Sequence, residues 1–408
     1  MRKKQEQSRV DISRRNLLGG VTAAAASTAL PSVATVKSTS SISNSFYDPW
    51  IEINADHLRH NAGEIQRRVN SRPILAVIKN NGYGLGVVNV ARVLEPLKST
   101  FGFAVIKLHE AMLLRDSGVR KPILLMGGCD ERNLRDAIAR DIMPMVFTPI
   151  GRELDRIASR RQRSAPIHIC VDTGFGREGV RAVDAPDLIR DLARRKSIRI
   201  RGLMMAFTED PELDPQELKQ FLEISESLRA EGIELGYRHA ASSYPLFKRP
   251  DSFLDMVRPG MALYGVYSER EFRSSGVMDL RPAVSLRARV VYVKQLRKGD
   301  RAGYSPAYTA TRDVWVALAT AGHADGWPRA TAKRGRVRIN NNLFPVIAVS
   351  ASHSIIEIGP SRIINIGDPV TFFDWQEGSR PEDLAAACGT SVYDHLMHLG
   401  ALLPRRVI

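Results

Sequence analysis

The chain has 408 residues, of which 44% are hydrophobic and 25% are charged. This length and composition exclude a single small binding module, and they set aside disordered, collagen-like and multi-spanning membrane proteins. The formal net charge of +15 permits contact with anionic surfaces, but we favour a solvated arginine-rich surface as its explanation. We find no zinc-finger spacing and no RNA-binding motif, so we expect no nucleic-acid partner. The three scattered cysteines predict no metal site and at most one disulfide: Cys129, Cys170 and Cys388.

Residues 1–34 have the three parts of a signal peptide. A charged segment up to Arg15 precedes an apolar, alanine-rich segment from Leu17 to Leu30, and Ser32-Val33-Ala34 offers small residues for cleavage. The pair Arg14-Arg15 before the apolar segment resembles a twin-arginine signal, the route that exports folded proteins. An uncleaved membrane anchor is the alternative, although the apolar run is shorter than the ~20 residues that a membrane span needs. We therefore expect cleavage and export to the periplasm through the twin-arginine machinery.

A linker rich in serine and threonine is expected over residues 35–49, and a barrel domain over residues 50–280. The barrel range alternates short β-type runs with amphipathic helical segments, including residues 108–118, 131–140 and 215–231, the last with Asp214 as its expected N-cap. Eight alternations match a closed (β/α)8 TIM-type barrel better than an open sheet with one crevice. The predicted strands are Ile74–Ile78, Phe101–Ile106, Ile123–Met126, Met145–Phe147, Ile167–Val171, Ile200–Met204, Tyr237–Ala240 and Met256–Arg258.

From residue 281 to residue 408 the pattern changes to β-type runs without helices between them. We expect a second, C-terminal β domain there. Because the active sites of barrel enzymes lie at the C-terminal ends of the strands, the chemistry is expected at those ends. The predicted strands of the second domain are Val284–Leu296, Val314–Thr320, Arg336–Ile339, Pro345–Val349, Ile355–Ile358 and Pro369–Phe373.

The first predicted barrel strand ends in Lys79, and a glycine-rich segment follows it. Partial burial at the mouth of a barrel lowers the pKa of a lysine and favours the free amine that a Schiff base requires. A lysine at a strand end is more often a solvated charge, but the glycine-rich backbone behind this one can approach an anion closely. The spacing of Gly82, Gly84 and Gly86 does not fit a dinucleotide-binding fingerprint.

Motifs along the chain resemble, in order, those of the fold-type III alanine racemases, which use pyridoxal phosphate. Ala76-Val77-Ile78-Lys79 with Tyr83-Gly84-Leu85-Gly86 is similar to the cofactor-lysine motif of that family. The resemblance implies a racemase that interconverts L- and D-amino acids, alanine or a broader set, with pyridoxal 5'-phosphate as cofactor. The other similar segments are Glu52–Asn61, Val171–Arg177, Gly202–Met204, His239–Ser243, Val257–Gly265, Gly322–Arg329, Gly389–Tyr393 and Pro404–Val407.

The resemblance implies two catalytic residues on opposite faces of the substrate. Lys79 would hold the cofactor and move a proton on one face of Cα, and Tyr304 would act on the other face from the second subunit of a homodimer. Racemisation needs two such groups because a single base returns the proton to the side that it left. Arg177 would bind the substrate and help Tyr304 to ionise, since the ordinary tyrosine pKa is about 10. The backbone amide of Ala351 would contact the substrate carboxylate.

The resemblance also implies the cofactor contacts. Arg258 would meet the pyridine nitrogen and, because arginine stays protonated, would leave that nitrogen unprotonated. The ring would then be a weaker electron sink, which favours proton return over transamination. The implied phosphate contacts are Tyr83, Ser243, Gly260, Met261 and Tyr393.

Several positions depart from the family pattern. Ala206 replaces a histidine near the cofactor ring, Cys170 replaces a lysine that positions Arg177, Ala351 replaces a methionine, and His323 replaces a tyrosine of the access channel. One interpretation is a wider pocket that accepts side chains larger than a methyl group. The alternative is a fold-type III enzyme that has drifted to another amino-acid reaction or has lost efficiency.

Other classes of protein explain fewer of these residues. A non-catalytic pyridoxal-phosphate carrier would need neither the β domain nor Tyr304. A decarboxylase of this fold type would need a stronger electron sink than Arg258 allows. A cell-envelope binding protein with a vestigial barrel would not depend on Lys79.

Overall fold

The structure, a computed structural model, describes residues 46–160, 162–305 and 307–408. The predicted signal peptide and linker residues 35–45 lie outside the described residues. Within the described ranges, no helix is both long and apolar enough to cross a membrane.

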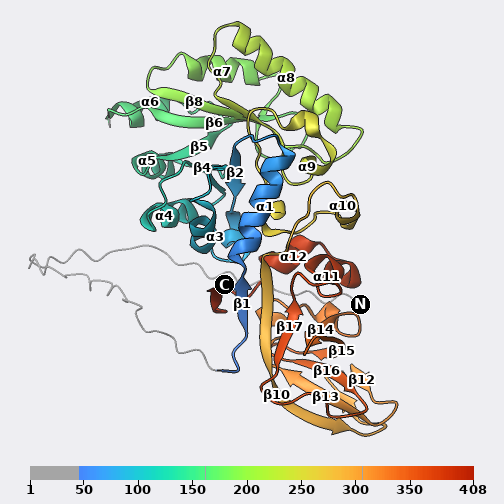
Figure 1. Ribbon diagram of the computed structural model, residues 1–408. Helices are drawn as coiled ribbons and strands as arrows, with labels where there is room; N and C mark the ends of the chain where they lie inside the picture. The colour runs from blue at the N-terminus through green and yellow to red at the C-terminus, as the bar shows by residue number, and fades with distance from the viewer. Residues whose placement is uncertain (1–45, 161, 306) are drawn as a thin grey trace, which may run out of the picture. The chain divides into compact units, whose positions relative to one another are not determined.

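Seven parallel strands in a row form the sheet of the predicted barrel, and the two-residue strand β7 (Val180–Arg181) pairs with β6 beside this row (Figure 1). The eighth position is a single parallel bridge between Ile74 and Val257. There the amide of Leu75 donates to the carbonyl of Val257 at 2.9 Å, and the amide of Arg258 donates to the carbonyl of Ala241 at 2.8 Å. The predicted barrel is confirmed, although its last predicted strand is reduced to this bridge. The strands are β2 (Ile74–Val77), β3 (Thr100–Val105), β4 (Ile123–Leu125), β5 (Ile142–Val146), β6 (Ala165–Asp172), β8 (Ile198–Met204) and β9 (Tyr237–His239).

Helices alternate with these strands, as the periodicity predicts. The expected helices over residues 108–118, 131–140 and 215–231 are observed as α4, α5 and α8. The expected cap of α8 is wrong: Leu213 is the N-cap, because the amide of Asp214 already bonds to the carbonyl of Asp210 at 2.9 Å. The helices are α1 (Ala55–Arg68), α3 (Val87–Leu94), α4 (Leu108–Asp116), α5 (Glu131–Ala139), α6 (Gly151–Arg160), α7 (Ala185–Ala193), α8 (Asp214–Ala230), α9 (Pro245–Lys248) and α10 (Arg270–Ser274).

The C-terminal β domain is built around one long strand, β10 (Val284–Leu296). The first half of β10 pairs with β17 (Pro369–Phe373) and its second half pairs with β13 (Val314–Ala319), both antiparallel. Because β13 and β17 belong to the same sheet, this double pairing closes the sheet on itself. β1 (Trp50–Ile53), which lies in the range expected for the barrel domain, instead joins this sheet between β10 and β18. The remaining strands are β13 (Val314–Ala319), β14 (Arg336–Ile339), β15 (Asn342–Val349), β16 (Ser354–Gly359), β17 (Pro369–Phe373) and β18 (Arg405–Val407).

Two short helices of the second domain were not expected, α11 (Pro381–Cys388) and α12 (Val392–Met397). They are too short to show a clear 3.6-residue period in the sequence. α12 lies against the segment that follows Lys79: a Cβ at Gly84 would come within 2.4 Å of the Leu396 carbonyl oxygen. The backbone of Gly84 is also left-handed (φ 88°), a conformation that glycine adopts without strain because it has no Cβ. α12 therefore brings Tyr393 to the mouth of the barrel.

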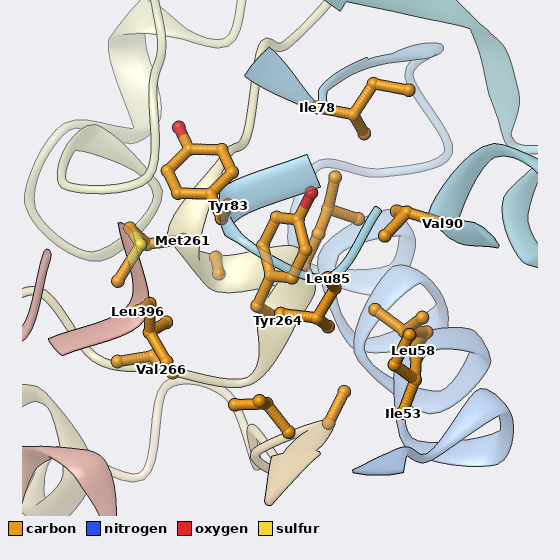
Figure 2. Packing of buried hydrophobic residues seen from close by; sticks show 14 of the residues in the cluster. Ile53, Leu58, Ile78, Tyr83, Leu85, Val90, Met261, Tyr264, Val266 and Leu396 are labelled. Carbon is orange, nitrogen blue, oxygen red and sulfur yellow. The ribbon is translucent and has the colours of Figure 1, made fainter. Parts of the chain in front are cut away.

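A buried hydrophobic cluster anchors the segment behind Lys79 (Figure 2). The rings of Tyr83 and Tyr264 lie 4.8 Å apart, and Met261 and Leu396 lie beside them. Each such side chain contributes about 1.5–3 kcal/mol by burial. Since Leu396 comes from α12 and the tyrosines come from the barrel, residues of both domains fix this segment.

Candidate active site

Lys79 stands just beyond the C-terminal end of β2, in the short helical turn α2 (Lys79–Tyr83). Asn80 and Asn81 continue the turn with left-handed backbone angles, which asparagine tolerates better than most residues. The amide of Asn81 donates to Oε1 of Glu110 at 2.6 Å, which ties the turn to α4. The position of the lysine is thus set by a buried strand before it and a fixed turn after it.

The environment of Lys79 favours its uncharged form. Burial is the largest cause that lowers its pKa from 10.5, and the positive charges of Arg177 and Arg258 lower it further. The carboxylates of Glu178 and Glu110 act in the opposite direction. A partly desolvated amine beside two guanidinium groups is a better nucleophile at neutral pH than a solvated lysine.

A cavity of about 250 Å³ opens in front of Lys79 at the C-terminal ends of the barrel strands. It brings together eight of the ten site residues predicted from the sequence. Two acidic residues that were not predicted, Glu178 and Glu209, also line it. Their loops follow β6 and β8, but nothing in the sequence pattern distinguished them from solvated loop carboxylates. The predicted residues that line the cavity are Lys79, Tyr83, Arg177, Ser243, Arg258, Gly260, Met261 and Tyr393.

Arg258 is buried in the floor of the cavity. Its Nη2 donates to the carbonyls of Met205 and Ala240, the second at 3.1 Å. Its Nε has no hydrogen-bond partner among the described residues. Burial lowers the pKa of the guanidinium to about 10, so it remains charged at neutral pH. Arg258 therefore presents a fixed positive charge with an unused donor.

Two histidines lie below Arg258, and the sequence analysis assigned neither of them a role. Nδ1 of His168 and Nε2 of His239 are 2.9 Å apart, and both rings are fully buried. Burial, followed by the charge of Arg258, lowers the pKa of His168 to about 3 and that of His239 well below 6.5. The pair is therefore neutral at physiological pH and adds no second positive charge near Arg258.

One end of the cavity gathers neutral hydrogen-bond donors. Oγ of Ser243 accepts from the amides of Gly260 and Ala262, both at 3.1 Å. A Cβ at Gly260 would come within 2.4 Å of the Tyr83 hydroxyl, so only glycine leaves this backbone open to close approach. Burial raises the pKa of Tyr83 and raises that of Tyr393 to about 12. Both phenols stay protonated and can donate to an anion.

Arg177 lies at the rim of the cavity, where it forms an ion pair with the neighbouring Glu178. Its guanidinium lies over the ring of Phe175, 4.5 Å from the centroid. Cys170 forms part of the cavity wall, and its Sγ donates to the Glu178 carbonyl at 3.4 Å. Burial raises the pKa of this thiol to about 11, so it is neutral. All three cysteines of the chain are free thiols. Within the described residues, no cluster of histidine, cysteine, aspartate or glutamate side chains could hold a metal ion.

Tyr304 and Ala351, the other two predicted residues, lie on the C-terminal domain and do not line this cavity. Tyr304 follows β11 (Arg301–Ala302), and its side chain is 78% exposed. It borders a separate hollow of about 250 Å³ together with Ser350 and His353. Ala351 is exposed beside this hollow, and its carbonyl accepts the amide of Ala324 at 3.0 Å.

A larger hollow of about 850 Å³ lies at the opposite, N-terminal end of β8 and β9. Arg199 and Arg201 of β8 line it, and Arg190 in its wall is already paired with Glu231. Barrel enzymes carry their chemistry at the other end of the strands. The cavity in front of Lys79 is therefore the candidate active site.

Comparison with known proteins agrees with this fold. The alanine racemase N-terminal domain family matches residues 53–268, and the alanine racemase C-terminal domain family matches residues 283–407. This chain belongs to the alanine racemase family. The match begins in β1, spans the barrel and ends in β18, so the family likeness includes both domains.

Relatives within the alanine racemase family cover nearly the whole described chain. The alanine racemase of Desulforamulus reducens is 33% identical over 365 residues, which covers 87% of this chain and 98% of the relative. That of Sorangium cellulosum is 31% identical over 376 residues, covering 87% and 97%. The crystal structure of alanine racemase from Streptomyces lavendulae superposes with a TM-score of 0.83 at 27% identity, covering 90% of this chain and 98% of that one. The family is one of amino-acid racemases, which are isomerases.

Proposed function

We propose that this protein is a pyridoxal-phosphate-dependent racemase that interconverts the L- and D-forms of alanine or of a broader set of amino acids. The observation that carries the proposal is the position of Lys79, a lysine with a lowered pKa that faces a cavity with a buried arginine and a cluster of neutral donors. Membership of the alanine racemase family supports the same reaction.

The residues of the cavity fit pyridoxal 5'-phosphate. Lys79 would bind the aldehyde carbon, and the donor cluster of Tyr83, Ser243 and Tyr393, with the backbone of Gly260 and Met261, would hold the phosphate. The unused Nε donor of Arg258 suits an acceptor such as a pyridine nitrogen. When bound, the cofactor supplies an electron sink that makes the α-proton of an amino acid removable. The cationic Arg258 would keep that sink moderate, which favours return of the proton to Cα.

Two residues of this chain would move the proton. Lys79, as a free amine, would take or return it on one face of Cα, and the hydroxyl of Tyr304 would do so on the other. Arg177 at the rim would attract the substrate carboxylate. Because Tyr304 is exposed and outside its own chain's cavity, we propose a homodimer in which the partner's Tyr304 completes each site.

Mixing two inactive variants tests the shared site. Lys79→Ala subunits and Tyr304→Phe subunits are dissociated, mixed in equal amounts and reassociated. A mixed dimer contains one site with both intact residues, so random pairing should restore about a quarter of wild-type activity. The two variants reassociated separately are the controls. No recovery from mixed dimers would show that each site uses its own tyrosine.

The small side chains Ala206 and Ala351 support a substrate range broader than alanine. Ala206 lines the cavity near Lys79, and Ala351 lies beside Tyr304. The test is loss of the α-proton signal in D₂O for a panel of L- and D-amino acids, with chiral separation of the products. Exchange with inversion establishes a racemase. Exchange without inversion, by protein that holds the cofactor, would indicate another amino-acid reaction.

We also propose that the protein is exported with its cofactor already bound. The support is the sequence alone, with Arg14 and Arg15 ahead of a short apolar segment. Because the twin-arginine route carries folded proteins, loading would take place before export. Replacing both arginines with lysine should retain the protein in the cytoplasm in a fractionation experiment. Unchanged export of that variant would contradict the twin-arginine route.

A further inference from the structure

Glu209 occupies the end of the cavity where the proposed phosphate contacts lie. It follows β8 and lines the same cavity as Ser243 and Tyr393. Its Oε1 accepts a hydrogen bond from Oγ of Ser242 at 3.2 Å, and Ser242 directly precedes Ser243. The carboxyl group is thus held next to the donor cluster.

The charged neighbours of Glu209 are themselves acidic. Burial is the main cause that raises its pKa, Asp214 of α8 and Glu269 ahead of α10 raise it further, and the Ser242 hydrogen bond opposes them. Glu209 in turn raises the pKa of Tyr393 on α12. Among the described residues, no lysine or arginine forms an ion pair with Glu209.

The cation that interacts with Asp214 has its own carboxylate partner. Arg249, which follows α9, forms an ion pair with Asp251. The hydrogen bond to Asp251 is the main cause that raises the pKa of Arg249, and the charges of Asp251 and Asp214 raise it further. Among the described residues, an ionised Glu209 would therefore add its charge to the cavity without an ion-pair partner of its own, although Arg177 and Arg258 line the same cavity.

We propose that Glu209 must take up a proton for the cavity to bind the phosphate of its cofactor tightly, so that cofactor affinity falls as Glu209 ionises. This inference rests on the proposed function, because it assumes that the donor cluster holds a phosphate. Although Glu209 is exposed, it lines the same cavity as the donor cluster, and two like charges that share a cavity repel each other and raise a dissociation constant. Protonation removes that repulsion and leaves a neutral carboxyl that can also donate a hydrogen bond.

The direction of the pH dependence follows from the ionisation. At low pH the carboxyl is neutral, and wild-type protein and a Glu209→Gln variant should bind the cofactor equally. As pH rises through the pKa of Glu209, only the wild type gains a negative charge at the phosphate end. Deprotonation of the cofactor phosphate itself, near pH 6, affects both proteins alike. The ratio of the two dissociation constants therefore isolates Glu209.

The experiment titrates cofactor-free, full-chain protein with pyridoxal phosphate between pH 5 and pH 9 and follows absorbance and protein fluorescence. Wild type, Glu209→Gln and the matched control Glu212→Gln, an exposed residue of the same loop, are compared. The dissociation constant of wild type should exceed that of Glu209→Gln by roughly tenfold at the highest pH, and this excess should shrink as pH falls. Pyridoxal, which lacks the phosphate, should show no difference between the proteins.

Each result of this titration bears on the proposal. A constant ratio near one at every pH, or an equal gain with pyridoxal, would overturn the role of Glu209 while leaving the proposed function intact. The same gain in Glu212→Gln would show that net charge, and not the position of Glu209, sets the affinity. Wild-type protein that binds pyridoxal phosphate at no pH would overturn the proposed function together with this inference.

Discussion

The cavity in front of Lys79 and the hollow beside Tyr304 are of similar volume but differ in what they contain. The cavity is lined by two arginines, by the lysine with a lowered pKa, by protonated phenols and by two carboxylates, and its floor is buried. The hollow is lined largely by small and aliphatic residues, with one exposed tyrosine at its edge. The cavity therefore suits the charged cofactor that we propose, and the hollow carries one exposed phenol that does not line the cavity of its own chain.

This difference suggests that the two domains have different roles in the proposed reaction. The barrel, with α12, would hold and activate the cofactor, and the C-terminal domain would supply the second proton-transfer group and limit the substrate side chain. If so, changes in the cavity should abolish cofactor attachment and activity together. Changes around the hollow should reduce activity or alter specificity and leave cofactor binding intact.

The largest effect is expected for Lys79→Ala. Removing the amine eliminates both the attachment of the cofactor and one of the two proton-transfer groups, so racemisation should fall by at least roughly a thousandfold. Activity is measured by chiral separation of alanine, and attachment by mass after borohydride reduction. Lys107→Ala, outside the cavity, is the matched control. Retained activity would exclude the proposed mechanism.

Tyr304→Phe should have the next largest effect, about a hundredfold to a thousandfold loss of racemisation. The variant should bind the cofactor as wild type does, because Tyr304 does not line the cavity. Exchange of the α-proton should be impaired for one enantiomer more than for the other. Tyr292→Phe, an exposed tyrosine on β10, serves as the control. Equal loss of exchange for both enantiomers would contradict a one-face role.

Ala351→Met should narrow the substrate range. Added side-chain volume beside Tyr304 should lower kcat/KM for amino acids with long side chains by about tenfold relative to alanine, the usual size of a hydrophobic pocket effect. The ratio of the two kcat/KM values is the readout, since it is insensitive to the amount of active protein. An unchanged ratio would place the substrate side chain elsewhere.

The order of the barrel strands could be predicted because each strand is a short apolar run between amphipathic helices. Lys79 could be predicted as well, since a strand end and a glycine-rich segment are both visible in the sequence. The terminal bridge at Val257 could not be distinguished from a strand, because a single parallel pair and a full strand have the same local composition. The pairing of β1 with β10 depends on contacts more than 230 residues apart and has no local signal.

The acidic residues of the cavity were missed for a similar physical reason. Glu178 and Glu209 lie in polar loops, where a carboxylate is usually solvated, and only the fold turns them toward Lys79 and the donor cluster. The His168 and His239 pair depends on β6 and β9, which are far apart in the sequence and lie on either side of β8 in the sheet. A residue's neighbours in space, more than its neighbours in sequence, decide its charge state.

The smallest predicted effect concerns the pKa of Lys79 and tests whether the rim residues act on it. Only the free amine reacts with pyridoxal phosphate, so the rate of uptake rises with pH through the pKa of Lys79. Glu178 raises that pKa and Arg177 lowers it. Glu178→Gln should therefore move the rise to lower pH, and Arg177→Leu should move it to higher pH.

Because both side chains are more than a third exposed, added salt should shrink both shifts. Arg181→Leu, an exposed arginine just beyond the rim, should leave the profile unchanged. Shifts in the same direction for the Glu178 and Arg177 variants would mean that packing, and not charge, couples the rim to the lysine.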